Sequence, residues 1–303
     1  MAERSPYRLF HVQLKQRIAL SPSMVRMVLT APEVAHMRSD GPDQRIKVFF
    51  PLPGQSAPQV PEGEDWYARY RALGDDERPP MRTYTIRALR RGQAEVDVDF
   101  VMHGETGPAS RWAVHARPGD RIALMAPDAE VPDPQGMGYE WKPPADAGEI
   151  LLVADETALP AVAGILETLA GQSAPPRVRA LLEVAHGDDV QPLKAPEGAQ
   201  LVWCVREGAG YGEELLQAVK SRIAPLAGGR GAAGTAPDLA EVDIDTQILW
   251  EQAAGTDAAP FYAWVAGEAG AVMAIRRYLV KECGLDRSTI TFMGYWRHGK
   301  VLE

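Results

Sequence analysis

The sequence contains few cysteines and no long apolar segment. Its only cysteines, Cys204 and Cys283, do not form a CxxC pair, which excludes a disulfide framework and a zinc site of the usual spacing and favours a reducing compartment. No apolar run approaches the roughly 20 residues that a membrane-spanning helix needs, and residues 1–16 contain no apolar signal-peptide stretch. We therefore expect a cytoplasmic protein without membrane insertion.

Basic residues are also in deficit. The chain has 32 Lys and Arg against 41 Asp and Glu, a formal net charge of −9, and this argues against a nucleic-acid partner, which requires a basic surface. The deficit is concentrated in one half: residues 1–147 carry 19 basic and 20 acidic residues, whereas residues 148–303 carry 13 and 21. An anionic ligand would therefore need a local basic cluster.

Several familiar catalytic motifs are absent as well. There is no Walker A loop, no HExxH zinc motif and no GxSxG nucleophile elbow, and no set of His, Asp and Glu indicates a fixed metal. The segment most similar to a phosphate-binding loop is Asp155-Glu-Thr-Ala-Leu-Pro160. Thr157 there is either the N-cap of an ordinary helix or part of a loop whose backbone N–H groups face a phosphate or a ring edge.

The first half of the chain has the pattern of β-strands separated by Ser, Pro and Gly breakers. Val96, Val98 and Phe100 alternate along one face, and Arg91-Gly92 predicts a hairpin turn before that strand. Residues 51–80, rich in Pro, Gly and charge, are predicted to form a long loop. The pattern predicts a small antiparallel β-barrel. The predicted strands are Phe10–Ile18, Met24–Leu29, Arg45–Phe50, Arg82–Arg87, Ala94–Val101 and Arg121–Met125, and the predicted helix is Ala109–Ala116.

The pattern changes after the Pro- and Gly-rich stretch Pro127–Gly148, so we predict domains 1–147 and 148–303. Continuous apolar runs, typical of strands buried on both faces, alternate there with helical patterns. This predicts a doubly wound parallel sheet, with a ligand beyond the carboxyl ends of its strands. Residues 225–240 are predicted to form a mobile surface loop. The predicted strands are Glu149–Ala154, Arg177–Val184, Gln200–Val205 and Phe261–Ala266, and the predicted helices are Leu159–Leu169, Glu213–Ile223 and Ala269–Lys281.

Four groups of motifs together resemble the siderophore-interacting protein family, flavoproteins of the ferredoxin-reductase-like superfamily that reduce ferric siderophores. The resemblance extends from about Tyr7 to Lys300, and the order and spacing of the motifs carry it. It implies an FAD-binding barrel in residues 1–147 and a nicotinamide-dinucleotide-binding domain in residues 148–303. The motifs are Arg82-Thr-Tyr-Thr-Ile-Arg87, Asp99-Phe-Val-Met-His-Gly104 with Gly107-Pro-Ala-Ser-Arg-Trp112, Ala154-Asp-Glu-Thr-Ala-Leu-Pro160, and Ala266-Gly-Glu268 with Gly294-Tyr-Trp-Arg297.

The resemblance implies an FAD site built from the first two of these groups. Alternation along a strand places Arg82 and Tyr84 on one face and Thr85 on the other. The resemblance implies that Arg82 neutralises the FAD pyrophosphate, that Tyr84 packs along the flavin and that Thr85 bonds near its redox-active edge. A surface arginine beside a half-buried tyrosine is the ordinary alternative. The further FAD candidates are Val101, His103, Ala109, Ser110 and Trp112. A structural histidine is the ordinary alternative for His103, and a core residue is the alternative for Trp112.

The second half supplies the candidates for the nicotinamide side of the flavin. The resemblance implies that Asp155 and Thr157 approach the isoalloxazine and nicotinamide rings, although the wider superfamily has a Gly-Thr-Gly-type loop here. Ala266, Gly267 and Glu268 follow a strand at the edge where a nicotinamide pocket is expected. Tyr295 and Trp296 are candidates for an aromatic cover over the flavin, or for ordinary C-terminal core packing.

Ferric siderophores are commonly anionic, so basic residues around the flavin are the substrate candidates. Lys47 matches the position of a basic residue implicated in the substrate cleft of this family, and Arg297 and Lys300 are its proposed partners. Solvated surface charges are the ordinary alternative.

The implied activity is an FAD-dependent reduction of ferric siderophores to release Fe(II), with NADPH or NADH as electron donor. No catalytic protein residue is predicted, because the flavin carries the chemistry. Alternatives are a general flavin or ferredoxin-type reductase, a ferredoxin as donor, and a non-catalytic module that binds an iron chelate. A donor 2′-phosphate favours a nearby Arg or Lys, and Arg206, after the third strand of the second half, is the candidate. The segment after the second strand is instead acidic, with Glu183, His186, Asp188 and Asp189, so the choice between NADH and NADPH stays open.

Overall fold

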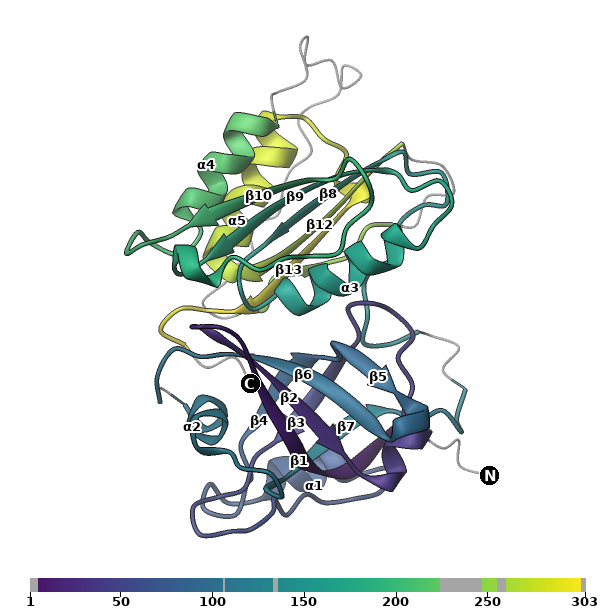
Figure 1. Cartoon of the computed structure of the whole chain (residues 1–303), viewed down its shortest axis with the longest axis vertical. Helices are drawn as coiled ribbons and strands as arrows, with labels where there is room; N and C mark the ends of the chain where they lie inside the picture. Colours follow the sequence, from purple (N-terminus) through teal and green to yellow (C-terminus); the bar gives the residue numbers. More distant parts are fainter. Residues whose placement is uncertain (1–4, 106, 133–135, 224–246, 255–259, 301–303) are drawn as a thin grey trace. The chain divides into compact units, whose positions relative to one another are not determined.

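The chain folds into two compact units, Met1–Tyr139 and Glu140–Glu303 (Figure 1). The computed structural model describes residues 5–105, 107–132, 136–223, 247–254 and 260–300. The predicted surface loop at 225–240 lies outside the described residues.

The division between the units lies before the boundary at 147/148 that the sequence pattern predicts. The Glu140 carboxylate accepts a hydrogen bond from the Trp250 indole at 3.2 Å, and the Glu140 carbonyl accepts one from the Tyr262 hydroxyl at 3.2 Å. The Trp141 ring packs edge-on against Tyr262, with centroids 5.4 Å apart. The later part of the Pro-rich stretch, from Glu140 on, is therefore built into the second unit.

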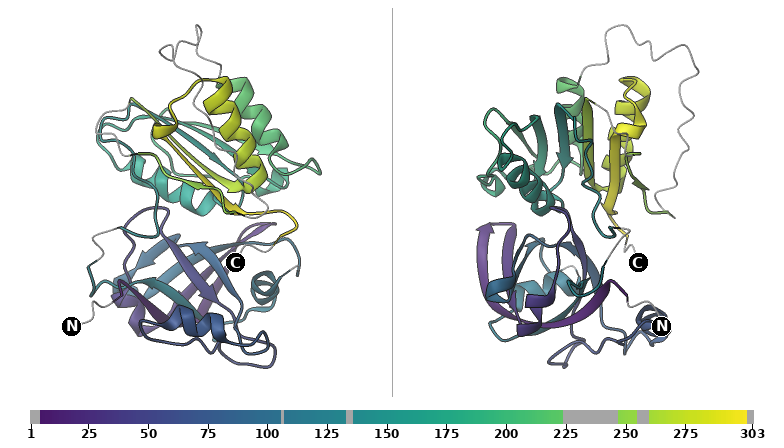
Figure 2. Two further views of the ribbon diagram at one scale, coloured as in Figure 1. Left: turned by 180° about the vertical axis from the view of Figure 1, so that it is seen from behind. Right: turned by 90° about the vertical axis from the view of Figure 1, so that its right-hand side faces the viewer.

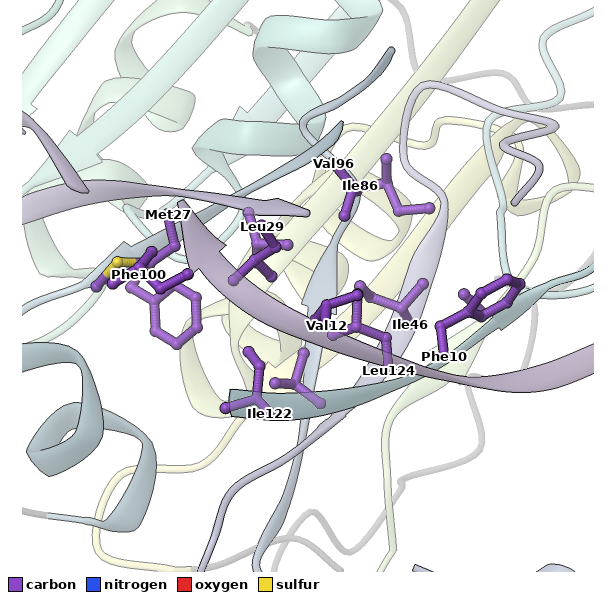
Figure 3. Packing of buried hydrophobic residues seen from close by; sticks show 14 of the residues in the cluster. Phe10, Val12, Met27, Leu29, Ile46, Ile86, Val96, Phe100, Ile122 and Leu124 are labelled. Atoms are coloured by element: carbon purple, nitrogen blue, oxygen red, sulfur yellow. The ribbon is translucent and has the colours of Figure 1, made fainter. Parts of the chain in front are cut away.

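The first unit is a seven-stranded antiparallel sheet around an apolar core. Its strands are β1 (Tyr7–Ser21), β2 (Met24–Thr30), β3 (Arg45–Phe49), β4 (Met81–Thr85), β5 (Ala88–Arg90), β6 (Glu95–Val101) and β7 (Arg121–Pro127). Their order is β4-β3-β7-β1-β2-β6-β5. Val96, Val98 and Phe100 belong to the core, as the alternation predicts. Figure 3 shows Val96 and Phe100 among the packed core side chains. The predicted antiparallel barrel is confirmed.

The predicted strand Arg82–Arg87 ends earlier in the structure, because β4 ends at Thr85 and a separate strand, β5, begins at Ala88 on the other edge of the sheet. β4 pairs with β3, whereas β5 forms the hairpin with β6 through a turn at Arg91–Gln93. The break falls at Ile86, whose N–H donates to the Gln44 carbonyl at 2.8 Å, and Arg87, whose N–H donates to the Asp97 carbonyl at 2.9 Å. The chain thus crosses from one sheet edge to the other, and the hairpin predicted before β6 joins it to β5.

This crossing leaves a gap between β4 and β6. Because β5 pairs only with Glu95–Asp97, the residues Val98–Val101 pair with β2 on one side and, among the described residues, have no ladder partner on the other. Backbone N–H and C=O groups on such an edge need partners.

The predicted loop at residues 51–80 contains a short helix, α1 (Trp66–Ala72). Its aromatic side chains explain the difference. Trp66 and Tyr70 pack edge-on against Phe49 of β3, with centroids 5.9 Å and 5.6 Å away. Burial of these rings against the outer face of the sheet stabilises a helix that the local composition does not predict.

The second unit is a six-stranded sheet with helices on both faces (Figure 2). Its strands are β8 (Glu149–Ala154), β9 (Arg177–Val184), β10 (Gln200–Val205), β11 (Trp250–Glu251), β12 (Phe261–Glu268) and β13 (Ile290–Trp296). In the order β10-β9-β8-β12-β13-β11, all pairs are parallel except β11 with β13. The predicted doubly wound sheet is confirmed, and β11 and β13 extend it beyond the predicted strands.

Four longer helices complete the described fold. They are α2 (Pro108–His115) in the first unit, and α3 (Leu159–Ala170), α4 (Glu213–Arg222) and α5 (Ala269–Arg277) in the second. Figure 2 shows α3 on one face of the second sheet and α4 and α5 on the other. A π-helical turn, Tyr278–Glu282, continues α5. Across the described ranges, every helix is too short or too polar to cross a lipid bilayer.

Gly138 is closely surrounded by side chains of the first unit, so its substitution tests how tightly that unit is packed. It has φ +82°, and an added Cβ atom would lie 2.1 Å from the Tyr7 hydroxyl and 2.5 Å from the Gln44 amide nitrogen, whereas Gly54 has φ +83° and no atom within 4 Å. Both Ala variants incur the left-handed backbone cost, but only Gly138→Ala creates an overlap. We expect Gly138→Ala to lower the unfolding free energy by about 1–3 kcal/mol more than Gly54→Ala. Equal losses in urea denaturation would contradict this packing.

Candidate functional site

Aromatic rings line the gap between β4 and β6 in the first unit. Tyr84 stacks on Phe100 with ring centroids 4.2 Å apart and an interplanar angle of 30°. Trp112 of α2 packs against Phe100 at 5.9 Å and against Phe50 at 5.7 Å. Burial raises the pKa of the Tyr84 hydroxyl, so this group stays neutral. We call Phe50, Tyr84, Phe100 and Trp112 the barrel-edge cluster.

The first turn of α2 offers backbone donors in the same unit. The helix begins at Pro108, with Gly107 in the N-cap position. N–H groups in a first turn have no partner within the helix and attract anions. Ala109 and Ser110 are buried in this turn, and a Cβ atom added to Gly107 would meet nothing within 4 Å. Open space therefore adjoins the turn, as binding of a diphosphate requires.

The pairing of β3 with β4 confirms the predicted alternation. Tyr84 is opposite Ile46 and Arg82 is opposite Val48, and both partners lie in the core. Arg82 is half-buried and donates to the Met81 carbonyl at 2.8 Å. The two candidates thus project from the same face of β4.

Lys47 projects from the opposite face of the same strand pair. It is paired with Thr83 and donates from Nζ to the Thr83 hydroxyl at 2.8 Å. The residue is exposed, yet partial desolvation of its ammonium and the Arg45 charge lower its pKa. Thr85 is buried and shares the Lys47 face. Lys47 is therefore a positioned cation whose partner is a neutral hydroxyl.

The remaining first-unit candidates flank the free edge of β6. Val101 ends β6 and is half-buried, and His103 follows it and is exposed. The sequence analysis assigned no binding role to Phe100 or Phe50. Alternation with Val98 places the Phe100 ring in the core, where both phenylalanine rings are fully buried.

In the second unit, four hydrogen bonds converge on the buried carboxylate of Asp155. One oxygen accepts from the Thr157 N–H at 2.9 Å and from its hydroxyl at 2.5 Å. The other accepts from the Glu268 N–H at 2.8 Å and from the Trp296 indole at 2.8 Å. We call Asp155, Thr157, Gly267, Glu268 and Trp296 the strand-end cluster, because it joins the carboxyl ends of β8, β12 and β13.

Gly267 allows the approach of Asp155. It has φ +150°, and a Cβ atom there would lie 2.7 Å from the Asp155 carboxylate. Its neighbour Ala266 is buried and pairs with Ala154 and Met293 in the sheet. The predicted nicotinamide edge is thus closely packed against the β8–α3 loop.

Glu268 is the N-cap of α5, and its carboxylate accepts hydrogen bonds from other residues of the second unit. Its carboxylate accepts from the Ala271 N–H at 2.9 Å, from Arg297 at 2.8 Å and from the His298 N–H at 3.1 Å. Burial alone would raise the pKa of Glu268, but Arg297 and these N–H groups outweigh it and lower the pKa. Arg297 is therefore neutralised, and exposed Lys300 follows it with an N–H bond to the Arg297 carbonyl at 3.1 Å.

The predicted N-cap role of Thr157 is wrong. The helix α3 begins at Leu159, the N-cap is Ala158, and no side chain caps it. The Thr157 hydroxyl donates to Asp155 instead, because the buried carboxylate needs donors more than the helix end needs an acceptor.

The two C-terminal aromatic candidates differ. Tyr295 stacks on Trp250 at 6.0 Å and packs edge-on against Trp264 at 6.2 Å. Trp296 is half-buried, bonded to Asp155 and edge-on to Tyr211 at 4.8 Å. Tyr295 is therefore part of an aromatic packing group, whereas Trp296 belongs to the strand-end cluster.

A cavity at these strand ends is large enough for about one water molecule. Asp155, Glu183, Gly212 and Glu268 are among its lining residues. Within the described ranges, no three or more His, Cys, Asp or Glu side chains are grouped to hold a metal ion. Side chains of the second unit therefore fill most of the space beyond the carboxyl ends of its strands.

The titration of Asp155 makes the stability of the folded protein depend on pH, and this dependence tests the strand-end cluster. Burial, followed by the charge of Glu156, raises the pKa of Asp155 to about 7. Between about pH 4 and pH 7 the folded protein retains a proton that the unfolded chain releases, so stability falls as pH rises through this window. We expect this fall to be absent in Asp155→Asn and present in the control Asp188→Asn, an exposed site. Parallel wild-type and Asp155→Asn curves in urea denaturation would contradict the raised pKa.

Comparison with known proteins agrees with both units. The family model described as a siderophore-interacting FAD-binding domain matches residues 13–131, and the siderophore-interacting protein model matches residues 147–299. Ferric vibriobactin reductase ViuB of Vibrio cholerae is 28% identical over 286 residues, which cover 94% of this chain and 88% of that protein.

Two further relatives have informative names. The NADPH-dependent ferric-chelate reductase of Escherichia coli is 33% identical over 128 residues, which cover 40% of this chain and 45% of that protein. The crystal structure of a siderophore utilization protein from T. fusca has a TM-score of 0.72 and 30% identity, covering 99% of this chain and 96% of that one. The chain therefore belongs to the siderophore-interacting protein family.

Proposed function

We propose that this protein is a cytoplasmic, FAD-dependent reductase of ferric siderophores that takes electrons from a nicotinamide dinucleotide. The observation that carries the proposal is the gap between β4 and β6, where the barrel-edge cluster lies beside the anion-attracting first turn of α2. The names of the V. cholerae and E. coli reductases support the choice of substrate.

The residues around the gap fit an FAD molecule. Arg82 and the first turn of α2, with the Ser110 hydroxyl, would hold its pyrophosphate. Tyr84 would pack along its flavin ring and Trp112 beside its adenine. When bound, FAD supplies the means of accepting electrons in pairs and passing them on singly.

The protein's own contribution is binding and electrostatics. Lys47 would attract an anionic ferric chelate, since its ammonium is exposed and its partner Thr83 carries no charge. Asp155 would position Trp296 through the indole hydrogen bond. Fe(III) gains one electron and becomes Fe(II), which oxygen ligands hold more weakly.

Purified protein provides the direct test of this function. We expect a yellow protein whose flavin absorbance is bleached anaerobically by a nicotinamide dinucleotide and restored by a ferric chelate, with Fe(II) appearing as the flavin reoxidises. A colourless protein that still binds the chelate would identify a non-catalytic binding module. Bleached flavin that the chelate fails to reoxidise would identify a general flavin reductase, and bleaching only by a reduced ferredoxin would replace the proposed donor.

The role of Lys47 can be tested separately. We expect Lys47→Ala to raise KM for an anionic ferric chelate about threefold to tenfold, because one favourable charge at a surface site is lost. FAD content is expected to stay unchanged, since Lys47 and Tyr84 lie on opposite faces of the strand pair. Thr83→Val, which releases the ammonium without removing it, should raise KM less. Arg117→Ala removes an exposed charge elsewhere in the unit and should match wild type; an unchanged KM in Lys47→Ala would remove Lys47 from the substrate site.

A further inference from the structure

A buried ion network lies at the carboxyl ends of β8, β9 and β10. Arg206 donates to both oxygens of Glu156, at 2.7 Å and 3.1 Å, and to Glu183 at 2.8 Å. All three side chains are buried. The guanidinium is therefore shared between two carboxylates, and the group as a whole carries one surplus negative charge.

The loop before α4 holds this network in place. The Gly212 N–H donates to both Glu183 oxygens, at 3.0 Å and 3.1 Å. The Tyr211 ring lies over the Arg206 guanidinium, 4.3 Å from its carbon. Arg206 is thus covered on one face by a ring and bonded along its edge by carboxylates, so turning it toward a new ligand would break several interactions at once.

The position of the network matters for the choice of electron donor. In doubly wound sheets the adenosine ribose binds beyond the second strand, where an acidic residue favours the 2′-hydroxyl of NADH and an arginine accommodates the 2′-phosphate of NADPH. β9 is the second strand of this unit and Glu183 lies near its end. The Arg206 N–H donates to the Val184 carbonyl at 3.0 Å, which places the arginine beside the end of β9.

Charges around the network add to the effect. Asp188 and Glu207 are exposed on the segments that follow β9 and β10. A 2′-phosphate would meet these carboxylates and an arginine already neutralised by Glu156 and Glu183. Like charges brought together in this way disfavour binding.

We propose that this protein takes NADH in preference to NADPH, and that Glu156 and Glu183 determine this specificity by holding Arg206. The proposal rests on the proposed function, and it separates this chain from the E. coli relative, whose name states that it is NADPH-dependent.

The first experiment compares the two donors on the FAD-loaded protein. In anaerobic stopped-flow reduction we expect the second-order rate constant for NADH to exceed that for NADPH about tenfold or more, as expected for an uncompensated like charge. Equal constants, or a larger one for NADPH, would overturn the proposal. If neither donor bleaches the flavin, the nicotinamide donor is wrong in both proposals. Protein reduced by dithionite then decides whether the reductase function survives, according to whether it reduces a ferric chelate.

The second experiment tests the residues. Glu156→Gln removes one carboxylate charge and loosens Arg206, and we expect it to raise the NADPH constant about tenfold while changing the NADH constant less than about twofold. The control Glu197→Gln removes an exposed charge just before the amino end of β10 and should leave both constants within about twofold. An unchanged donor ratio in folded Glu156→Gln, checked by thermal unfolding, would remove Glu156 and Arg206 from the specificity.

A measurement on wild-type protein covers the case in which Glu156→Gln does not fold. Salt screens repulsion between a phosphate and surface carboxylates. We therefore expect the NADPH constant, divided by the NADH constant, to rise with ionic strength. A ratio that does not change with salt would overturn the electrostatic basis of the proposal.

Discussion

The arrangement of the second unit depends on the buried carboxylate of Asp155. Parallel strands end without ladder partners at their carboxyl edge, and the donors there must be satisfied by something else. Asp155 does this for its own loop through Thr157, for the β12–α5 junction through the Glu268 N–H, and for the end of β13 through Trp296. Gly267 is required beside it, since a side chain would overlap the carboxylate. The α5 cap and the C-terminal aromatic segment are therefore placed by one group.

The first unit meets a related constraint in a different way. Its chain crosses from β4 to β5 at Ile86, so β4 and the end of β6 keep free edges among the described strands. Tyr84 and Phe100 cover the gap with apolar rings rather than with another strand. In the second unit, carboxylates line the small cavity at the strand ends, whereas in the first unit open space adjoins Gly107 at the start of α2.

The hydrogen-bonding partner of each basic side chain determines whether that side chain can still attract an anion. Arg206 and Arg297 would count as basic sites from the sequence, yet both are bonded to buried glutamates. Lys47 is bonded to a hydroxyl and is exposed, so it keeps its attraction for anions.

The sequence by itself determined the two-part fold, the core face of β6 and the family, because strand alternation, apolar runs and ordered motifs are local patterns. Predicted candidates such as Asp155 and Trp296 are brought together as the ends of parallel strands require. Only the tertiary structure decided the division of β4 from β5, the helix α1 within a Pro-rich loop, the bonding of Thr157 and the neutralisation of Arg206 by Glu183. Each of these depends on a partner distant in the chain, and the free energy that settles it comes from burial and pairing that no local pattern contains.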